Sequence, residues 1–370
     1  MAIDTLGANA LASNSVTTAK IAADAVTSAK IPAGAVVASD VADGSVTTAK
    51  LAAGAVTTAK VADDAVTGAK LYAENLGRRN LIINGAMSIN QRGATSGVTS
   101  GYFVDRFQLS GCSASAVITS STPTEFPTAI TVSATSGNPI ILQKIESKMV
   151  QHLSGKVVTV SFYAKNISNA TTLYTSLQYA GSADNFGSTT TISEQNLGNL
   201  TTDWVKYTAS WTVPAGGLNG LSLNILCAGS STFTMGVTGV QLEVGDTDTP
   251  FEHRSYGEEL QLCQRYFYPV CPKNISGQSI GMAYYYVGTT LLGIVHFPVT
   301  MRTAPTITGA DVSNYFTTTH NDLLNYLLAN RVTTTTLEFY NNSQASGTAM
   351  QAVIARSNNA NAFIYATAEL

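Results

Sequence analysis

The chain has 370 residues, enough for two or three domains, and a formal net charge of −3 at neutral pH. Nothing in this near-neutral balance indicates the basic surface of a nucleic-acid-binding protein, so no nucleic-acid partner is expected. No stretch approaches the roughly 18 apolar residues of a transmembrane helix, which predicts no membrane insertion. Met1–Ala10 lacks the basic start and apolar core of a signal peptide, so we expect synthesis in a cytoplasm.

Residues 15–71 carry a repeat with a period of ten residues. A valine recurs at one phase, and a second aliphatic residue follows five positions later. A lysine precedes most members of the second set, and Asp40 interrupts that series. Such a short fixed period predicts a quasi-one-dimensional array. The two sets are Val16, Val26, Val36, Val46, Val56 and Val66, and Ile21, Ile31, Val41, Leu51, Val61 and Leu71.

A single chain cannot hold this repeat in one conformation. Burying its two large side chains gives about 3–6 kcal/mol per repeat, whereas fixing ten backbone residues costs about 10–20 kcal/mol. The repeat therefore predicts a parallel homo-oligomer, and the alternative is a low-complexity linker. Because five-residue spacing and Pro32 disfavour helix, we expect short extended segments such as Ser45–Leu51, joined by tight turns.

Packed cores begin after the repeat, since every aromatic residue lies at or beyond Tyr72. From Asn80 to His253 short β-branched and aromatic runs alternate with Gly, Asn and Ser clusters, which predicts a β-sandwich. We expect Trp204 and Trp211 to pack in its core. The clearest predicted strands are Val157–Tyr163, Thr172–Tyr179, Val205–Val213 and Leu221–Leu226.

One short helix is predicted over Tyr256–Tyr268, where Leu260, Cys263 and Phe267 follow helical spacing and Pro269 ends the pattern. Such a helix either packs around an oligomer axis or lies on one sandwich. Strands resume after it, and the chain closes with a β-rich domain. Its predicted strands are Ser279–Val287, Leu291–Val299, Thr333–Tyr340, Met350–Ile354 and Ala362–Leu370.

Three consecutive tyrosines mark the first of these strands. Tyr284 and Tyr286 share one face of a strand, and Tyr285 takes the other. Aromatic faces stack on sugar rings and phenol hydroxyls bond sugar hydroxyls. Tyr284, Tyr285, Tyr286 and Tyr340 are therefore candidate glycan-binding residues, and packing in a core or an interface is the alternative.

No metal, cofactor or catalytic residue is predicted. Asp246 and Asp248 are too few for a calcium site, and the four scattered cysteines favour free thiols. Asp105 and Arg106 suit a structural ion pair or cap. From Val270 onward there are four acidic residues and no nucleophile motif, which argues against an enzyme. Those acidic residues are Asp311, Asp322, Glu338 and Glu369.

A series of motifs, in this order, resembles the β-sandwich module and tip of bacteriophage tail fibre proteins, over roughly residues 80–310. The resemblance implies a jelly-roll-like sandwich similar to carbohydrate-binding modules, and three as the number of chains in the oligomer. The motifs are Asn80–Gly93, Asp105–Phe107, Gly155–Phe162, Trp211–Gly216, Gln241–Gly245, Thr249–Arg254, Cys263–Phe267 and Phe297–Pro305.

The predicted molecule is a mainly β, elongated homotrimeric fibre that attaches a virion to a bacterial surface glycan such as lipopolysaccharide. The alternative is a structural spacer of the tail whose receptor-binding activity lies in another chain. The N-terminus would join the tail baseplate or an adjacent fibre protein, and the repeat valines with Ile21, Ile31 and Leu51 would form the trimer core. The predicted parts are a tail attachment segment (1–14), shaft (15–71), linker (72–79), sandwich (80–253), helical connector (254–269) and receptor-binding tip (270–370).

Overall fold

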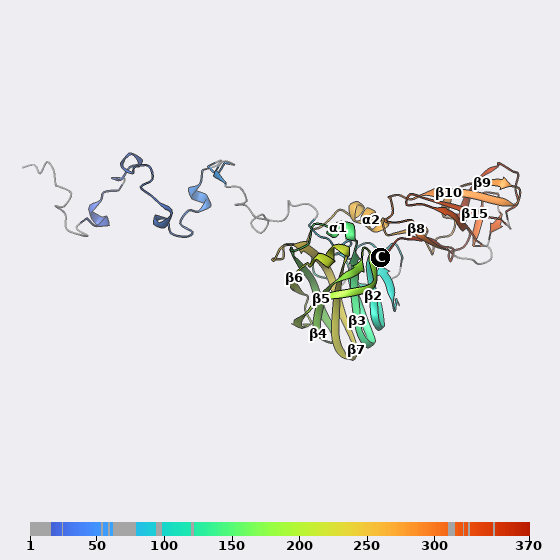
Figure 1. Ribbon diagram of the computed structural model, residues 1–370, viewed down its shortest axis with the longest axis horizontal. Helices are drawn as coiled ribbons and strands as arrows, with labels where there is room; N and C mark the ends of the chain where they lie inside the picture. The colour runs from blue at the N-terminus through green and yellow to red at the C-terminus, as the bar shows by residue number, and fades with distance from the viewer. Residues whose placement is uncertain are drawn as a thin grey trace, which may run out of the picture. The chain divides into compact units, whose positions relative to one another are not determined.

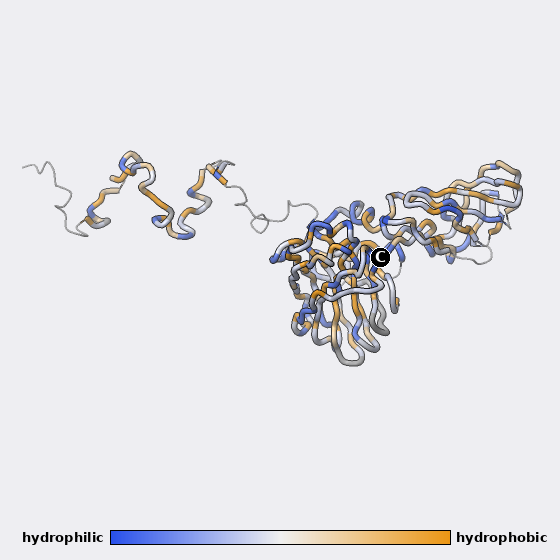
Figure 2. Tube along the Cα trace, in the orientation of Figure 1, coloured by the Kyte–Doolittle hydropathy of each residue, from blue (hydrophilic) through white to orange (hydrophobic). Residues whose placement is uncertain are grey.

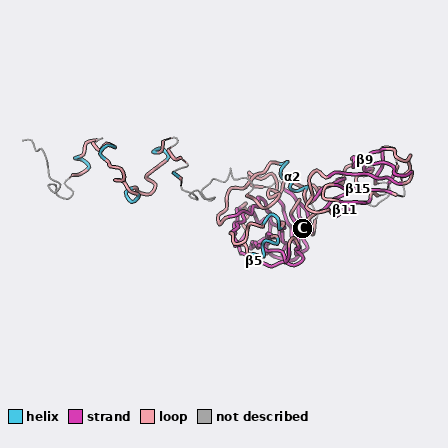
Figure 3. Tube along the Cα trace, turned by 45° about the horizontal axis from the view of Figure 1, so that its top comes forward, coloured by secondary structure: helices cyan, strands magenta, loops and turns pink. Residues whose placement is uncertain are grey.

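The computed structural model describes residues 16–61 (except 24, 53–54 and 58–59), 79–93, 98–119, 122–309, 315–320, 322–324, 326–342 and 345–370. The predicted attachment segment 1–14, most of the linker, and Val66 and Leu71 of the repeat lie outside the described residues. The chain divides into two compact units, residues 1–67 and 68–370. The regular structure of the second unit consists mainly of β-strands, which confirms the predicted mainly β class (Figure 3). Among the described residues, no helix is long and apolar enough to span a membrane.

The repeat forms tight turns, as expected, but the prediction of extended segments between them was wrong, because Ser45–Leu51 itself contains a 3-10 turn. A 3-10 turn recurs with the period of the sequence (Figure 1). In one repeat, the Lys50 amide donates to the Thr47 carbonyl (2.9 Å) and the Ser45 amide to the Ala42 carbonyl (3.0 Å). Two turns in each period replace an extended run. The 3-10 turns are η1 (Thr18–Lys20), η2 (Ser28–Lys30), η3 (Ala38–Asp40) and η4 (Thr48–Lys50).

The lysine side chain of the repeat bonds back to the backbone across a turn. Lys30 Nζ donates to the Ala25 carbonyl and Lys50 Nζ to the Ser45 carbonyl, both at 2.6 Å. Each lysine side chain thus bonds to the carbonyl five residues earlier, which is half of one repeat. At the position where Asp40 replaces lysine, its carboxylate instead accepts a hydrogen bond from the Val37 amide (3.0 Å).

The apolar side chains of the repeat remain exposed in the single chain. The described valines of the first set are 52–59% exposed, and Ile21, Ile31 and Leu51 are 44–45% exposed. Figure 2 shows apolar residues recurring along this unit. None of these side chains contributes to a core among the described residues of the repeat, which matches the energetic estimate for one chain.

A seven-stranded antiparallel sheet builds the sandwich, in the order β1-β2-β3-β7-β4-β5 with β6 paired to β4. Two predicted strands are parts of β4 and one lies within β7, whereas the predicted Val205–Val213 extends one residue beyond β6. The short helices α1 (Ser147–Val150) and η8 (Ala215–Asn219) join strands. The strands are β1 (Gly101–Val104), β2 (Phe107–Thr119), β3 (Ala129–Ile145), β4 (Val157–Ser182), β5 (Asn185–Asn199), β6 (Val205–Thr212) and β7 (Leu221–Val244).

The longest strands bend, and this makes two layers from one sheet. The 26 residues of β4 would extend roughly 85 Å if straight, far longer than a domain of this size. The longest irregular stretch of the β4–β7 pairing runs from Asn166 to Leu173. Before this point even-numbered residues such as Val158 face the core, and after it odd-numbered residues such as Leu177 do. Both halves therefore cover the same core.

Helix α2 (Tyr256–Gln264) begins where predicted, with Ser255 as its N-cap. It ends four residues earlier than predicted because Phe267–Cys271 form strand β8, which pairs with β17. Pro269 thus lies in an edge strand, where the missing amide is tolerated. The helix lies on the sandwich of its own chain, one of the two arrangements expected. The contacts join Cys263 and Tyr266 to Ile83 and Ile89.

Two further antiparallel sheets form the C-terminal domain, in the orders β13-β12-β16-β9-β10-β15-β14 and β11-β17-β8. They share a core that includes Tyr285, Phe316 and Phe339. The strands are β9 (Ser279–Val287), β10 (Thr290–His296), β11 (Thr306–Gly309), β12 (Phe316–Thr318), β13 (Leu323–Leu324), β14 (Leu328–Val332), β15 (Thr336–Asn341), β16 (Ala352–Ser357) and β17 (Ile364–Thr367).

The residues after β17 dock on the sandwich through buried charges. The Glu369 carboxylate accepts hydrogen bonds from Arg92 (3.1 Å) and from Arg106. The Arg106 guanidinium is fully buried and lies 3.5 Å from the centre of the Tyr266 ring. Asp105 pairs with Arg92 at 3.1 Å, and burial raises the pKa of Asp105 from 3.8 to about 6. Asp105 and Arg106 are thus structural, as predicted, although they pair with Arg92 and Glu369 and not with each other.

Candidate functional site

The outward face of the large C-terminal sheet carries most of the predicted glycan-binding residues. On β9, Ala283 and Tyr285 point into the core, whereas Met282, Tyr284 and Tyr286 point outward. This alternation is what an antiparallel strand with one covered face requires. The strand was predicted with the same bounds, and the face assigned to each tyrosine is confirmed.

Strand register places Tyr340 on the same face. Leu292 of β10 lies opposite Tyr284 on one side and Tyr340 of β15 on the other. The adjacent row places Ile294 between Met282 and Glu338. We call this surface the tip face, defined as Met282, Tyr284, Tyr286, Leu292, Ile294, Glu338 and Tyr340.

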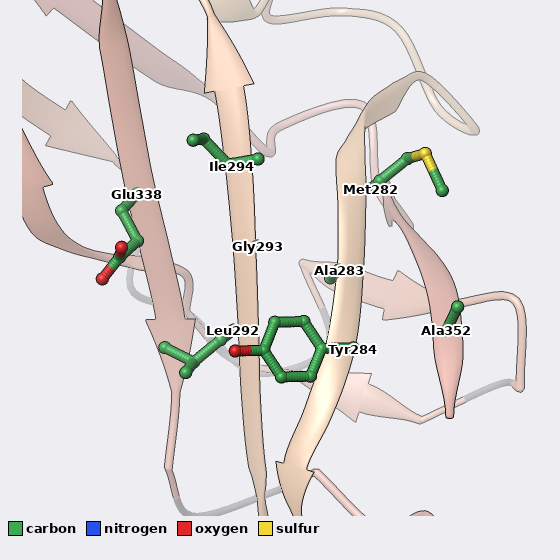
Figure 4. A pocket seen from close by; sticks show the side chains of 8 residues that line it. All are labelled: Met282, Ala283, Tyr284, Leu292, Gly293, Ile294, Glu338 and Ala352. Atoms are coloured by element: carbon green, nitrogen blue, oxygen red, sulfur yellow. The ribbon is translucent and has the colours of Figure 1, made fainter. Parts of the chain in front are cut away.

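A hollow of about 400 Å³ lies on the tip face (Figure 4). Tyr284 extends beside Leu292, and Glu338 projects from the next strand. Met282 is 68% exposed and Tyr286 54% exposed. A contiguous exposed apolar surface of this kind marks an interaction site. The hollow is lined by Met282, Ala283, Tyr284, Leu292, Gly293, Ile294, Glu338 and Ala352.

The tip face can offer two kinds of contact to a ligand. Its tyrosine rings present flat apolar surfaces with a hydroxyl at the edge. Glu338 is the one charged residue lining the hollow, and its carboxylate already accepts a hydrogen bond from the Asn330 amide. A carboxylate accepts several hydrogen bonds at once, so Glu338 retains capacity for ligand hydroxyls. The apolar members Met282, Leu292 and Ile294 were missed, although they follow the same two-residue alternation as the tyrosines.

Tyr285 does not belong to the tip face, which corrects its assignment as a glycan-binding residue. Its side chain is fully buried, and its hydroxyl donates a hydrogen bond to Asp322. A side chain at Gly347 would overlap the Tyr285 ring, so glycine is required there. Burial, followed by the bond to Asp322, raises the pKa of Tyr285. Tyr285 therefore supports the loop that contains Gly347 and has no surface free for a sugar.

The two tryptophans have different environments. Trp211 is 3% exposed in the sandwich core and its indole donates to the Ser193 carbonyl (3.1 Å), as the prediction of core packing requires. Trp204 is only partly buried and lies outside that core, so its predicted role was wrong. Trp204 immediately precedes β6. The alternation of inward and outward side chains along β6, continued back by one residue, places Trp204 on the outer face.

The remaining polar candidates are structural. Asp248 pairs with Lys206 at 2.7 Å. Within the described part of the chain, no group of three or more His, Cys, Asp or Glu side chains could hold a metal ion. Cys227, Cys263 and Cys271 are buried free thiols, whereas the Cys112 side chain and Asp311 lie outside the described residues.

No family model and no curated protein matches the chain. Among solved structures, the enzymatically active domain of bacteriophage CBA120 tailspike protein 4 is 15% identical, over 45% of this chain and 21% of that chain, with a TM-score of 0.32. The CBM22-1 xylan-binding domain from Paenibacillus barcinonensis is 14% identical, over 46% and 96%, with a TM-score of 0.31. A putative sugar binding protein from Bacteroides thetaiotaomicron is 14% identical, over 45% and 100%, with a TM-score of 0.30. At these low scores, the assignment of a β-sandwich rests on the strand pairing and shared core described above.

Proposed function

We propose that this chain is a phage tail fibre that attaches the virion to its host bacterium by binding a surface glycan through the tip face. The observation that carries the proposal is the placement of Tyr284, which is 38% exposed, and the half-buried Tyr340 on the same outward face of the sheet, on either side of Leu292 and close to Glu338. The ordered motifs that resemble tail fibre modules give the proposal its biological setting.

The spacing of the two rings suits an extended glycan. Tyr284 and Tyr340 lie on strands two apart in the sheet, so their backbones are roughly 10 Å apart. Two neighbouring sugar residues of a polysaccharide can lie over such a pair. Their apolar ring faces would stack on the tyrosines, and their hydroxyls would bond the phenol oxygens and Glu338.

The repeat supplies the means to present several tip faces together. Its exposed valines and Ile21, Ile31 and Leu51 would be buried between parallel copies, which we propose number three. Three tips on one shaft convert weak individual contacts into tight attachment, because the second and third binding events are intramolecular. The N-terminus would join the tail baseplate or an adjacent fibre protein.

Binding of the full-length protein to host cells and to purified lipopolysaccharide tests this function. Replacing both rings (Tyr284→Ala with Tyr340→Ala) is expected to abolish binding, whereas Tyr256→Ala, at a tyrosine 65% exposed on α2, should leave it unchanged. Binding that survives the double substitution would overturn the tip face as the site. If the wild-type protein does not bind, and a different purified virion protein fully blocks adsorption of the phage to its host, the structural spacer would be supported instead.

A further inference from the structure

Polar side chains at the end of β7 are buried against the segment that follows the strand. Gln241 and Glu243 lie on the face of β7 opposite to Leu242, which packs in the sandwich core. The Glu252 amide donates to the Gln241 side-chain oxygen (2.8 Å). The Thr249 amide donates to Glu243 (2.9 Å). Because the following segment covers this face, Gln241 is fully buried and Glu243 is 2% exposed.

The Thr249 hydroxyl contacts both of these side chains and an arginine. It donates a hydrogen bond to Glu243 Oε2 (2.6 Å) and accepts one from Gln241 Nε2 (3.2 Å). The same nitrogen also donates to Glu243 Oε1 (2.9 Å). The Arg79 guanidinium donates to the Thr249 hydroxyl (2.5 Å) and lies 3.8 Å from Glu243 Oε2. A hydroxyl has one proton and two lone pairs, so with both lone pairs engaged its proton points to the nearest acceptor, the carboxylate.

These groups are the components of an acyl-transfer reaction. A hydroxyl held against a carboxylate can lose its proton as it attacks a carbonyl carbon. The backbone amide bonded to the Gln241 oxygen polarises this carbonyl and stabilises negative charge that develops on the oxygen. The carbon to be attacked is bonded to Nε2, the atom that the Thr249 hydroxyl already contacts. Since Gln241 is fully buried, the threonine hydroxyl, and not solvent water, is the nucleophile beside it.

We propose that Thr249 and Gln241 form an ester cross-link within the chain. Thr249 Oγ1 attacks Gln241 Cδ, and Glu243 takes the hydroxyl proton. The bond between Cδ and Nε2 then breaks, and Glu243 returns the proton to the nitrogen, which leaves as ammonia. The new bond joins Oγ1 to Cδ and the Glu243 carboxylate is regenerated. The reaction consumes no oxidant, reductant or further reactant.

The cross-link would close the place where the chain both enters and leaves the sandwich. Arg79 donates to the Pro250 carbonyl (3.2 Å), and the Asn80 amide donates to the Glu252 carboxylate (2.6 Å). The first residues of the sandwich thus bond to the segment that leads away from it. A covalent bond from Thr249 to β7 keeps that segment attached when the chain on either side is pulled. This role does not depend on glycan binding by the tip face.

The intact mass of the full-length protein tests the cross-link directly, because ester formation removes one ammonia. The folded protein is incubated, denatured and weighed by mass spectrometry. We expect a mass about 17 Da below that of the sequence, after allowance for loss of the initiator methionine. Digestion with a protease that cuts after glutamate then locates the bond. Cleavage after Glu243 should leave the peptides that carry Gln241 and Thr249 joined.

Variants assign the loss of ammonia to these groups. Thr249→Val keeps the shape of the side chain without its hydroxyl and should have the full mass of its sequence. Glu243→Gln removes the base and should also have the full mass. Thr249→Ser keeps a hydroxyl and should lose ammonia. Thr247→Val is the matched control at a neighbouring exposed threonine, whose hydroxyl bonds to Asp246 (3.1 Å), and should lose ammonia as the wild type does.

Two results would overturn the cross-link. The first is a wild-type mass equal to that of the sequence, in which case hydrogen bonds alone join these groups. This result needs no variant, so it does not depend on whether a substitution disturbs folding. The second is the same loss of mass in Thr249→Val, because the ammonia would then come from another amide, such as that of Asn219, which precedes a glycine.

Discussion

The repeat and the sandwich place the same residue type in opposite environments. Val158 and Val160 of β4 are fully buried, whereas Val46 and Val56 of the repeat are more than half exposed. In the sandwich, strands far apart in sequence pair and enclose a core. In the described residues of the repeat, hydrogen bonds link positions close to one another in the sequence, and the valines stay exposed. Local bonding shapes a chain, but only contacts with a distant segment or another chain bury its apolar residues.

The largest expected effect on stability comes from removing a buried charge where the residues after β17 dock on the sandwich. Glu369→Ala would leave the fully buried Arg106 without its carboxylate, which costs about 3–5 kcal/mol in the free energy of unfolding. Denaturant unfolding followed by tyrosine and tryptophan emission measures this loss. Glu194→Ala, at an exposed carboxylate of β5, should change stability by less than about 0.5 kcal/mol. Equal effects of the two variants would show that the buried ion pairs do not hold the C-terminal residues on the sandwich.

The same substitution in each unit sharpens the comparison. Val160→Ala should lower the free energy of unfolding by about 2 kcal/mol, through lost burial and a cavity. Val46→Ala should leave the unfolding of the sandwich unchanged and weaken association between chains. Unfolding curves and sedimentation of both variants separate these effects. A Val46→Ala variant that destabilises the sandwich would contradict the independence of the two units.

The pH dependence of stability tests the same buried charges in another way. Because folding raises the pKa of Asp105 from 3.8 to about 6, the folded state holds this proton more tightly than the unfolded state. Its contribution is complete below the unfolded pKa and is lost as pH rises through about 6. Asp105→Asn cannot titrate, so its stability should fall less than that of the wild type between about pH 4 and pH 7. Parallel curves for the two proteins would show that Asp105 does not titrate in this range.

Sequence patterns correctly predicted the elements that depend on neighbouring residues, and failed where a distant segment sets the structure. The bounds of β9 were correct because Met282, Tyr284 and Tyr286 alternate cleanly with core residues. The end of α2 was not, because β8 is fixed by pairing with β17, about a hundred residues away. The bend in β4 was also missed, since a two-residue period does not show where a strand changes its inward face.

The same limit applies to the candidate sites. Alternation separated Tyr285 from its neighbours, yet only the packing of Gly347 and Asp322 shows that its ring is fully enclosed. The outward position of Trp204 was missed because it depends on the pairing of β4 with β6, which brings Tyr163 opposite Lys206. Tight turns were expected in the repeat, but the spacing of apolar residues does not predict the bonds from lysine ammonium groups to backbone carbonyls that accompany them.

The solution mass of the intact chain, by sedimentation equilibrium or light scattering, tests the central claim that the repeat requires partner chains. We expect three times the chain mass of 38.7 kDa. Placing aspartate at Val26 and Val46 should reduce it toward one chain, whereas aspartate at the neighbouring Thr27 and Thr47 should not. A wild-type protein that remains at 38.7 kDa at all concentrations would contradict the claim.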